Sequence, residues 1–462
     1  MKLNRKGSGA VPLLLLLALF TATFFVYRDF GIRMLLGFGV LCVLLAAELG
    51  KRLRDRAPIR PHSVRGAMLA LAAVIAVNFL RPDSQHSADT LSYVISMTVC
   101  TGFLWLWREN DWEWVWVQRL LLGAAVVLTA LVLLYLIFPE PVYGLLYPRV
   151  SPVAQHYFDY FLPKGYGICL GGYTFTDYII FCGIAVCWAK IAAAPKRSLR
   201  DLLWLGLILV FGFAILTLGR RGELLGAVVL CAAMVLLLCT PKMRIALILG
   251  GGCGILLLLW LFVRFLPQIK EIDIFYRYVR TVENLVNGYD FTSGRMGLYA
   301  LAIEGFRSAP LFGIGFDRFY TLVNPLLTDI EGNVMQDAHN IYLQMLCETG
   351  IVGTVLTLVP MLWLLVTTFR ALQFARRLPD RRGVEPLTVS LLIQSYLLFL
   401  GLLDPTFQKI VFWCFYALAA MGLLWGMDRA GWKPAGPLSA LFDRAAGLVT
   451  VPLGWIWRKL DR

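Results

Sequence analysis

One histidine lies where a basic side chain could act in catalysis. His339 directly precedes residues 340–350, in which apolar residues recur at helical spacing. Asp337 or Asn340 can cap the first turn of this helix, and Gly350 suits its C-terminal end. Because a helix dipole disfavours a positive charge near the N-terminus, we expect a neutral imidazole that can accept a proton. The histidine could also serve only as a helix cap, and its position alone favours that role.

Two arginine sites could bind an anion. Arg220 and Arg221 stand in a very short connection between two apolar segments. Charges are costly near hydrocarbon, so they usually serve a pathway or a ligand there, although snorkelling at a helix end explains them equally well. Arg295 is expected in the first turn of another helix, where a cation opposes the helix dipole. An anionic partner would explain this position, and so would a surface arginine that binds nothing.

The helix that carries Arg295 is expected over residues 294–307. Ser293 can act as its cap, and Pro310 forces a break after it. The spacing predicts that one apolar face is formed by Met296, Tyr299, Ile303 and Phe306. Gly313 and Gly315 lack the third glycine and the strand of a dinucleotide-binding loop, so we predict a tight turn there.

Metal-ligating patterns are weak in this chain. The acidic pairs Glu271/Asp273 and Asp329/Glu331 lie in a segment that we expect to be a solvated loop. The ten cysteines fall almost entirely inside apolar segments, without CxxC pairs. We therefore expect no metal site, no disulfide framework and no cofactor.

The elements that position these residues are predicted to be membrane helices. Of the 462 residues, 59% are hydrophobic and only 16% are charged, and the mean hydropathy is +0.71. Such a chain is too apolar for a soluble globular protein, so we expect an all-α, polytopic membrane protein. The net charge of +14 comes from short Lys and Arg clusters between apolar runs. This pattern is typical of topology signals and argues against a nucleic-acid partner.

The apolar runs predict about twelve transmembrane helices, each near the length that crosses a bilayer. The first follows a basic segment over residues 1–10 and is interpreted as an uncleaved helix. The predicted spans cover residues 11–26, 31–49, 64–80, 90–107, 118–138, 168–189, 202–218, 223–239, 245–266, 350–369, 386–402 and 410–427.

The positive charges predict the orientation of these spans. With the N-terminus inside, the larger share of the 43 Lys and Arg residues lies on the cytoplasmic side. Residues 1–266 would then hold helices one to nine, and 350–427 helices ten to twelve. Residues 267–349 would form one large extracytoplasmic, helical loop domain, and 428–462 a cytoplasmic tail.

The run HNIYLQMLCETGIVG at 339–353, with TSGR at 292–295 and PLFGIGF at 310–316, resembles the signature of the O-antigen ligase superfamily. That superfamily includes bacterial protein O-oligosaccharyltransferases and is related to O-antigen polymerases. The motif-bearing part extends from about residue 293 to 353, and the remaining hydrophobic frame is similar to the family in general layout.

This resemblance implies roles for the candidate residues. The ligases have an arginine at the matching extracytoplasmic turn and an arginine and a histidine in the large loop. The resemblance therefore implies that His339, Arg295 and Arg220 are catalytic. It also implies that Arg220, Arg221 and Arg295 bind a pyrophosphate, as guanidinium groups bind phosphate oxygens bidentately.

The implied activity is transfer of O-antigen polysaccharide from undecaprenyl pyrophosphate to lipid A-core oligosaccharide, at the periplasmic side of the bacterial inner membrane. His339 would take the proton of the acceptor hydroxyl and the arginines would neutralise the departing diphosphate. Direct displacement would invert the anomeric centre, whereas retention would need two close carboxylates. Protein O-oligosaccharyltransferase, O-antigen polymerase and a flippase of lipid-linked sugars stay open as alternatives.

One further histidine lies in an aromatic-rich segment. His156 belongs to residues 139–165, which are predicted to be a long outer loop that could cover the lipid or shape the acceptor side. His62 and His86 lack neighbours that would give them a role.

Overall fold

The computed structural model describes residues 61–86, 88–106, 111–170, 173–194, 198–238, 275–288, 294–323, 337–405 and 410–460, with a few single positions besides. Within these ranges every regular element is a helix and no strand occurs. The predicted all-α class is therefore confirmed.

Five helices are long and apolar enough to cross a membrane. They are α6 (Asp111–Ile137), α9 (Tyr173–Ala193), α10 (Leu199–Thr217), α11 (Arg221–Leu238) and α16 (Ile341–Ala375). The helices α4 (Ser63–Phe79) and α17 (Val384–Leu400) are apolar but shorter. The predicted spans at 11–26 and 31–49, and most of 245–266, lie outside the described residues, so the count of about twelve stays a prediction.

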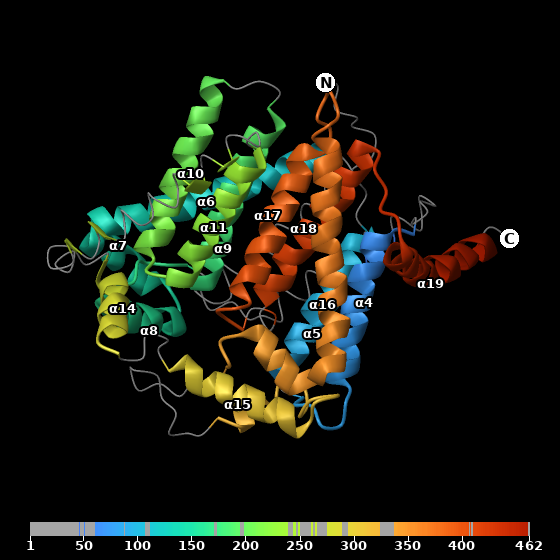
Figure 1. Ribbon diagram of the computed structural model, residues 1–462, viewed down its shortest axis with the longest axis horizontal. Coiled ribbons are helices and arrows are strands. Elements are labelled where there is room, and N and C mark those ends of the chain that lie inside the picture. Colours follow the sequence, from blue (N-terminus) through green and yellow to red (C-terminus); the bar gives the residue numbers. More distant parts are fainter. Residues whose placement is uncertain are drawn as a thin grey trace.

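The bundle is built around three central helices (Figure 1). α17 packs against α9 and against α18 (Ile410–Ala430). On one side α9 contacts α6 and α10, and on the other α18 contacts α5 (Ala88–Leu106), which pairs with α4. Large aromatic side chains such as Trp413, Tyr416 and Tyr178 are fully buried in this core. The turns that carry the candidate residues are therefore mounted on closely packed helices.

The helix after His339 begins as predicted and then continues. Asn340 is its N-cap, with its side-chain oxygen accepting from the amides of Tyr342 and Leu343 at 3.1 and 3.2 Å. At Gly350 the backbone leaves the helical region with φ at 64°, and the helix resumes in the next residue. The break at Gly350 is thus confirmed, but it is a kink inside one long element, α16.

The helix α15 (Arg295–Ser308) lies within one residue of its predicted bounds. Gly294, with φ at 83°, occupies the N-cap position, whereas Ser293 lies outside the described residues. The predicted apolar face is not the one that packs, because Met296 and Ile303 are exposed and the buried residues are Leu298, Ala302 and Gly305. The reason is close packing on α16: a Cβ on Gly305 would lie only 2.4 Å from the Cys347 sulfur.

Two segments that were predicted as a loop and a tail are helical. Residues 139–165 form α7 (Pro139–Leu146), a 3₁₀ turn (Tyr147–Arg149), α8 (Pro152–Phe161) and a second 3₁₀ turn (Leu162–Lys164) around a small core of their own. We call residues 139–165 the outer-loop unit. The C-terminal part forms α19 (Pro437–Leu460), which packs on α4 and projects from the bundle in Figure 1.

Candidate active site

The candidate residues meet at a carboxylate that the sequence did not point to. Asp404 lies in the turn after α17, and its side chain is only 12% exposed. His339 Nδ1 lies 3.7 Å from one carboxylate oxygen of Asp404. Arg220 Nη2 lies 3.8 Å from the other. Asp404 therefore joins the histidine of the large loop to the arginine turn.

His339 is not the cap of its helix. Asn340 fills that role, and His339 stands before it with φ at 49°, in the left-handed region that L residues rarely adopt. Its side chain is 30% exposed, and its Nδ1 has no hydrogen-bond partner among the described residues. A strained residue whose polar atom faces a buried carboxylate fits a functional role better than a structural one.

Buried polar side chains of α16 hold the backbone next to His339. The amide of Ala338 donates to Gln344 Oε1 at 3.2 Å, and Gln344 Nε2 donates to Glu348 at 3.2 Å. Glu348 also accepts the amide of Phe319 at 3.1 Å. On the other side, the amide of Ile341 donates to the carbonyl of Gly401 at 2.8 Å. His339 is thereby fixed relative to the turn that bears Asp404.

Arg220 is surrounded by carboxylates. Its Nε donates to Glu223 Oε1 at 2.7 Å, and its Nη2 also donates to that oxygen. Burial lowers the pKa of Arg220, but Glu223 and Asp404 outweigh this effect and raise the pKa above its ordinary value. The positive charge of Arg220 is consequently compensated within the protein.

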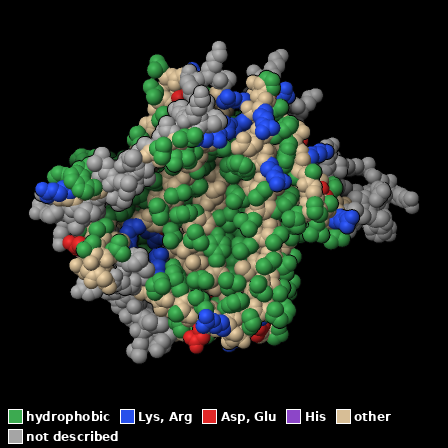
Figure 2. All heavy atoms as spheres, in the orientation of Figure 1, with side chains coloured by type: hydrophobic (Ala, Val, Ile, Leu, Met, Phe, Trp, Pro, Cys, Tyr) green, Lys and Arg blue, Asp and Glu red, His purple; other side chains and the backbone are tan. Residues whose placement is uncertain are grey.

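Arg221 lies in the opposite environment. Its Nη1 donates to Thr281 Oγ1 on α14 (Tyr276–Val286), and Arg280 of that helix and Arg295 lie close enough to repel it. Arg295 Nη1 donates to the carbonyl of Leu403 at 2.9 Å. In the part of the chain that the structure describes, no ion pair joins these three arginines to a carboxylate. Figure 2 shows Lys and Arg side chains gathered in a hollow near α8 and α14.

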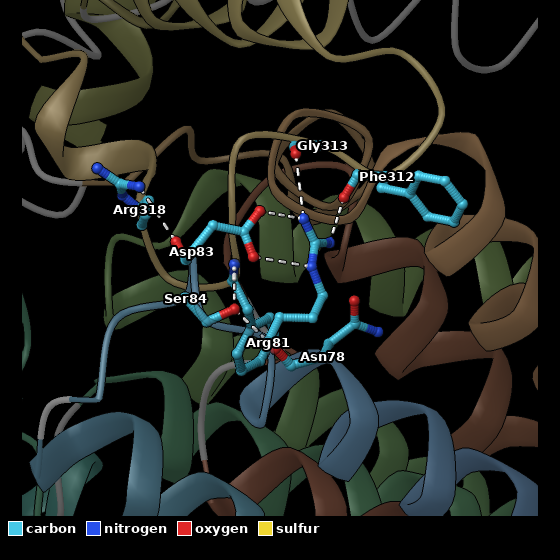
Figure 3. A network of polar contacts seen from close by, with 8 residues as sticks. Asn78, Arg81, Asp83, Ser84, Phe312, Gly313 and Arg318 are labelled. Atoms are coloured by element: carbon cyan, nitrogen blue, oxygen red, sulfur yellow. Dashed lines mark hydrogen bonds and ion pairs between the residues drawn. The ribbon is translucent and has the colours of Figure 1, made fainter.

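The turn over residues 312–318 is fastened to the connection between α4 and α5 (Figure 3). Arg81 binds both carboxylate oxygens of Asp83 and donates to the carbonyls of Phe312 and Gly313. Arg318 Nη1 donates to the carbonyl of Asp83 at 3.1 Å. The bond from Arg81 lowers the pKa of Asp83. We call this set of contacts the Arg81 clasp.

The glycines of this turn are needed where two backbones touch. A Cβ on Gly315, at φ of 118°, would lie 2.0 Å from the carbonyl oxygen of Asp83. A Cβ on Gly313 would lie 2.3 Å from the carbonyl carbon of Glu348, and one on Gly350 would lie 2.3 Å from the carbonyl oxygen of Leu311. The predicted tight turn is therefore present, and it also locks into the kink of α16.

The other three histidines do not join the site. His62 caps α4, with Nδ1 accepting from the amide of Val64 at 3.2 Å. Burial, with help from Arg65 and Lys433, lowers the pKa of His62 to about 4, so its ring stays neutral and able to accept that bond. His86 packs edge-on against Phe79, and His156 lies on the outer-loop unit.

Sequence reasoning missed Asp404 and Arg280. Asp404 is an acid between two predicted apolar spans, at 386–402 and 410–427, and this placement was the available signal. No signal in the sequence pointed to Arg280, because its proximity to Arg221 depends on how α14 lies against the turn that carries Arg220 and Arg221. The predicted acidic pairs at 271–273 and 329–331 lie outside the described residues. The residues that the structure describes hold no group of three His, Cys, Asp or Glu side chains arranged for a metal ion.

Comparison with known proteins agrees with the geometry. The sequence model of a family described as O-antigen ligase matches residues 202–358, a segment that contains Arg220, Arg221, Arg295 and His339. No curated protein matches the chain significantly. The match confirms the resemblance seen in the motifs and supports, in general terms, an O-antigen ligase or polymerase type of function on lipid-linked polysaccharides. Together with the apolar helices it indicates a multi-pass membrane protein.

Proposed function

From the match of residues 202–358 to a family described as O-antigen ligase, we propose that the chain is an O-antigen ligase. It is an inverting, metal-independent glycosyltransferase that moves O-antigen polysaccharide from undecaprenyl pyrophosphate to lipid A-core oligosaccharide. The protein lies in the bacterial inner membrane, and the end of the bundle that carries His339 faces the periplasm. Its surroundings there are membrane lipids, and nucleic acid plays no part.

The observation that carries this proposal is the contact between His339 and Asp404 beside the arginine turn. A carboxylate at that distance favours the tautomer with its hydrogen on Nδ1, which leaves Nε2 to take the proton of the acceptor hydroxyl. Asp404 then stabilises the imidazolium that forms. Arg220, already paired with Glu223 and Asp404, serves by holding Asp404 in place.

Arg221 and Arg295, which form no ion pair with a carboxylate among the described residues, act on the leaving group. Arg221 and Arg295 bind the diphosphate, whose negative charge removes the repulsion between them. The acceptor oxygen forms a bond to the anomeric carbon while the bond from that carbon to the diphosphate oxygen breaks. The electron pair leaves with the diphosphate, where the guanidinium groups stabilise the growing charge. The anomeric configuration inverts, and no covalent intermediate with the protein forms.

The related activities differ in the acceptor and not in this chemistry. A protein O-oligosaccharyltransferase would use a protein hydroxyl, and a polymerase would use a sugar of a second lipid-linked chain. A flippase would place charges through the bilayer midplane, whereas the arginines and His339 lie together at one end of the bundle.

The test is a deletion in the native bacterium, complemented with the wild type or with His339→Ala. We expect the deletion strain to lose polymer on lipid A-core and to accumulate lipid-linked polymer. Only the wild-type gene, and not His339→Ala, should restore the ladder of lipopolysaccharide bands. Loss of glycoproteins with an intact lipopolysaccharide ladder would assign the protein as an oligosaccharyltransferase instead. Shortened polymers that are still attached to lipid A-core would assign it as a polymerase.

A further inference from the structure

A row of aromatic rings leads from the outer-loop unit to the start of α9, next to the candidate active site. His156 stacks on Tyr160 with centroids 6.2 Å apart, and Tyr160 meets Phe161 edge-on at 4.9 Å. Phe161 then contacts Tyr166 at 4.9 Å and Tyr173 at 5.3 Å. His156 is exposed, Tyr160, Phe161 and Tyr166 are half-buried, and Tyr173 is buried. The row thus runs from the surface into the protein.

The inner end of this row lies beside Asp404, on the side of the base. The segment around Gly167 crosses the end of α10 so closely that a Cβ there would lie 2.8 Å from the Thr217 carbonyl oxygen. The residue after Tyr173 is Thr174, whose hydroxyl lies 3.4 Å from Asp404 Oδ2. Arg221, in contrast, is contacted from α14. A molecule lying along the rings would therefore approach His339 from the Asp404 side.

The outer-loop unit also presents a polar aromatic group. Tyr143 and Tyr147 stack with centroids 4.8 Å apart, and both hydroxyls donate to Asp159, at 3.0 and 2.8 Å. Partial burial and this carboxylate raise the pKa of Tyr143 to about 12, so its hydroxyl stays protonated. Flat rings with hydrogen-bonding groups at their edges suit pyranose sugars, which offer C–H faces and hydroxyl rims.

An aromatic belt at the membrane surface is the competing explanation for these rings. The unit already has a separate apolar residue for lipid contact, because Leu145 is strongly exposed, as is Phe138 directly before the unit. Leu145 lies two residues from Tyr143 on α7, which places the two side chains on opposite sides of that helix. The aromatic and acidic side chains are thus distinct from the apolar surface.

We propose that the outer-loop unit binds the oligosaccharide part of the acceptor, with the sugars lying on the rings that lead to Asp404 and His339. This inference rests on the proposed transferase function and adds a site for the acceptor. It assigns Tyr147 and Tyr160 as acceptor-binding residues, whereas the donor diphosphate is held by the arginines near α14.

The experiment uses the full-length protein in lipid nanodiscs and core oligosaccharide released from lipid A by mild acid. Binding is measured by calorimetry for the wild type, Tyr147→Ala, Tyr160→Ala and Tyr160→Phe, with Tyr320→Ala as the control, since Tyr320 is exposed but lies outside the row. We expect each alanine variant to weaken binding about tenfold, because it removes an aromatic stacking face. Tyr160→Phe and Tyr320→Ala should bind like the wild type.

Steady-state transfer then separates this inference from the proposed function. The alanine variants should raise the KM for the acceptor and leave the KM for the donor unchanged. Suppose that the wild type transfers glycan and that the alanine variants have the same acceptor KM as the wild type, or raise only the donor KM. The proposed acceptor site would then be wrong, and the proposed function would stand. If the wild type binds the oligosaccharide through Tyr160 but transfers nothing, the sugar site stands and the proposed function falls.

Discussion

Arg220 and Arg221 are neighbours in sequence but lie in opposite electrostatic environments. Arg220 faces Glu223 and Asp404, and its charge is compensated inside the protein. Arg221 faces Arg280 and Arg295, and in the described part of the chain it has no carboxylate partner. Holding like charges close together is unfavourable unless an anion joins them. In the proposed mechanism this difference separates a base side, with His339, Asp404 and Arg220, from a diphosphate side, with Arg221, Arg280 and Arg295.

The sharpest test of the base side is His339→Ala. Removing the base while the arginines remain should lower transfer by roughly 10²- to 10⁴-fold, the usual scale for loss of a general base. Donor binding should persist, because no diphosphate ligand is lost. Transfer and binding of lipid-linked donor are measured on the same nanodisc preparation, with His86→Ala as the control. A near-normal rate in a folded His339→Ala protein would refute the proposed mechanism.

The diphosphate side is tested by Arg221→Ala and Arg295→Ala. Each should raise the donor KM and lower kcat, with kcat/KM falling roughly 10- to 100-fold, because the same cations meet the diphosphate before and during its departure. Lysine at either position should restore little of the lost kcat/KM, since a point charge cannot reproduce the bidentate hydrogen bonds of a guanidinium group. Arg307→Ala, on the exposed side of the helix that bears Arg295, is the matched control. Equal donor KM values in variant and wild type would show that Arg221 and Arg295 do not bind the donor.

Asp404→Asn tests whether Asp404 acts through His339. An amide keeps the shape but no longer stabilises the imidazolium, so kcat should fall by roughly 10- to 100-fold, a cost of about 1.4 to 2.7 kcal/mol. The donor KM should stay unchanged, because Asp404 does not contact the diphosphate in the proposed mechanism. A rise in donor KM with kcat unchanged would place Asp404 on the diphosphate side instead.

Local sequence rules were sufficient for features that depend on a few consecutive residues. The cap at Asn340, the break at Gly350 and the turn at Gly313 and Gly315 follow from side-chain and backbone preferences within one turn. The motif resemblance supplied Arg220, Arg221, Arg295 and His339 as one site, because a family signature carries long-range information that periodicity lacks.

Features that depend on distant packing were not predictable in the same way. Asp404 reaches His339 only because the end of α17 packs against the start of α16, through the bond from Ile341 to Gly401. The apolar face predicted for α15 is not the one that packs on α16, since hydrophobic spacing cannot show that a neighbour requires small residues such as Gly305. The helices of the outer-loop unit were missed because each is shorter than a clear periodic signal.

The smallest predicted effect is that of a change in the Arg81 clasp. The clasp fastens the turn over residues 312–318, and this turn packs against the kink of α16, the helix that begins next to His339. We therefore expect the clasp to support the base side alone. The pKa of Asp83 is lowered in the folded protein by its bond to Arg81. A group with a lowered folded pKa contributes stability above its unfolded value and loses it as the pH falls through the folded one. Asp83→Asn should therefore lower Tm by a few degrees at neutral pH, and this difference should decrease as the pH falls, as followed by thermal scans from pH 7 to 3. Donor KM should be unchanged in the variant. A Tm difference that does not decrease as the pH falls, or a raised donor KM, would contradict the assignment of the clasp to the base side.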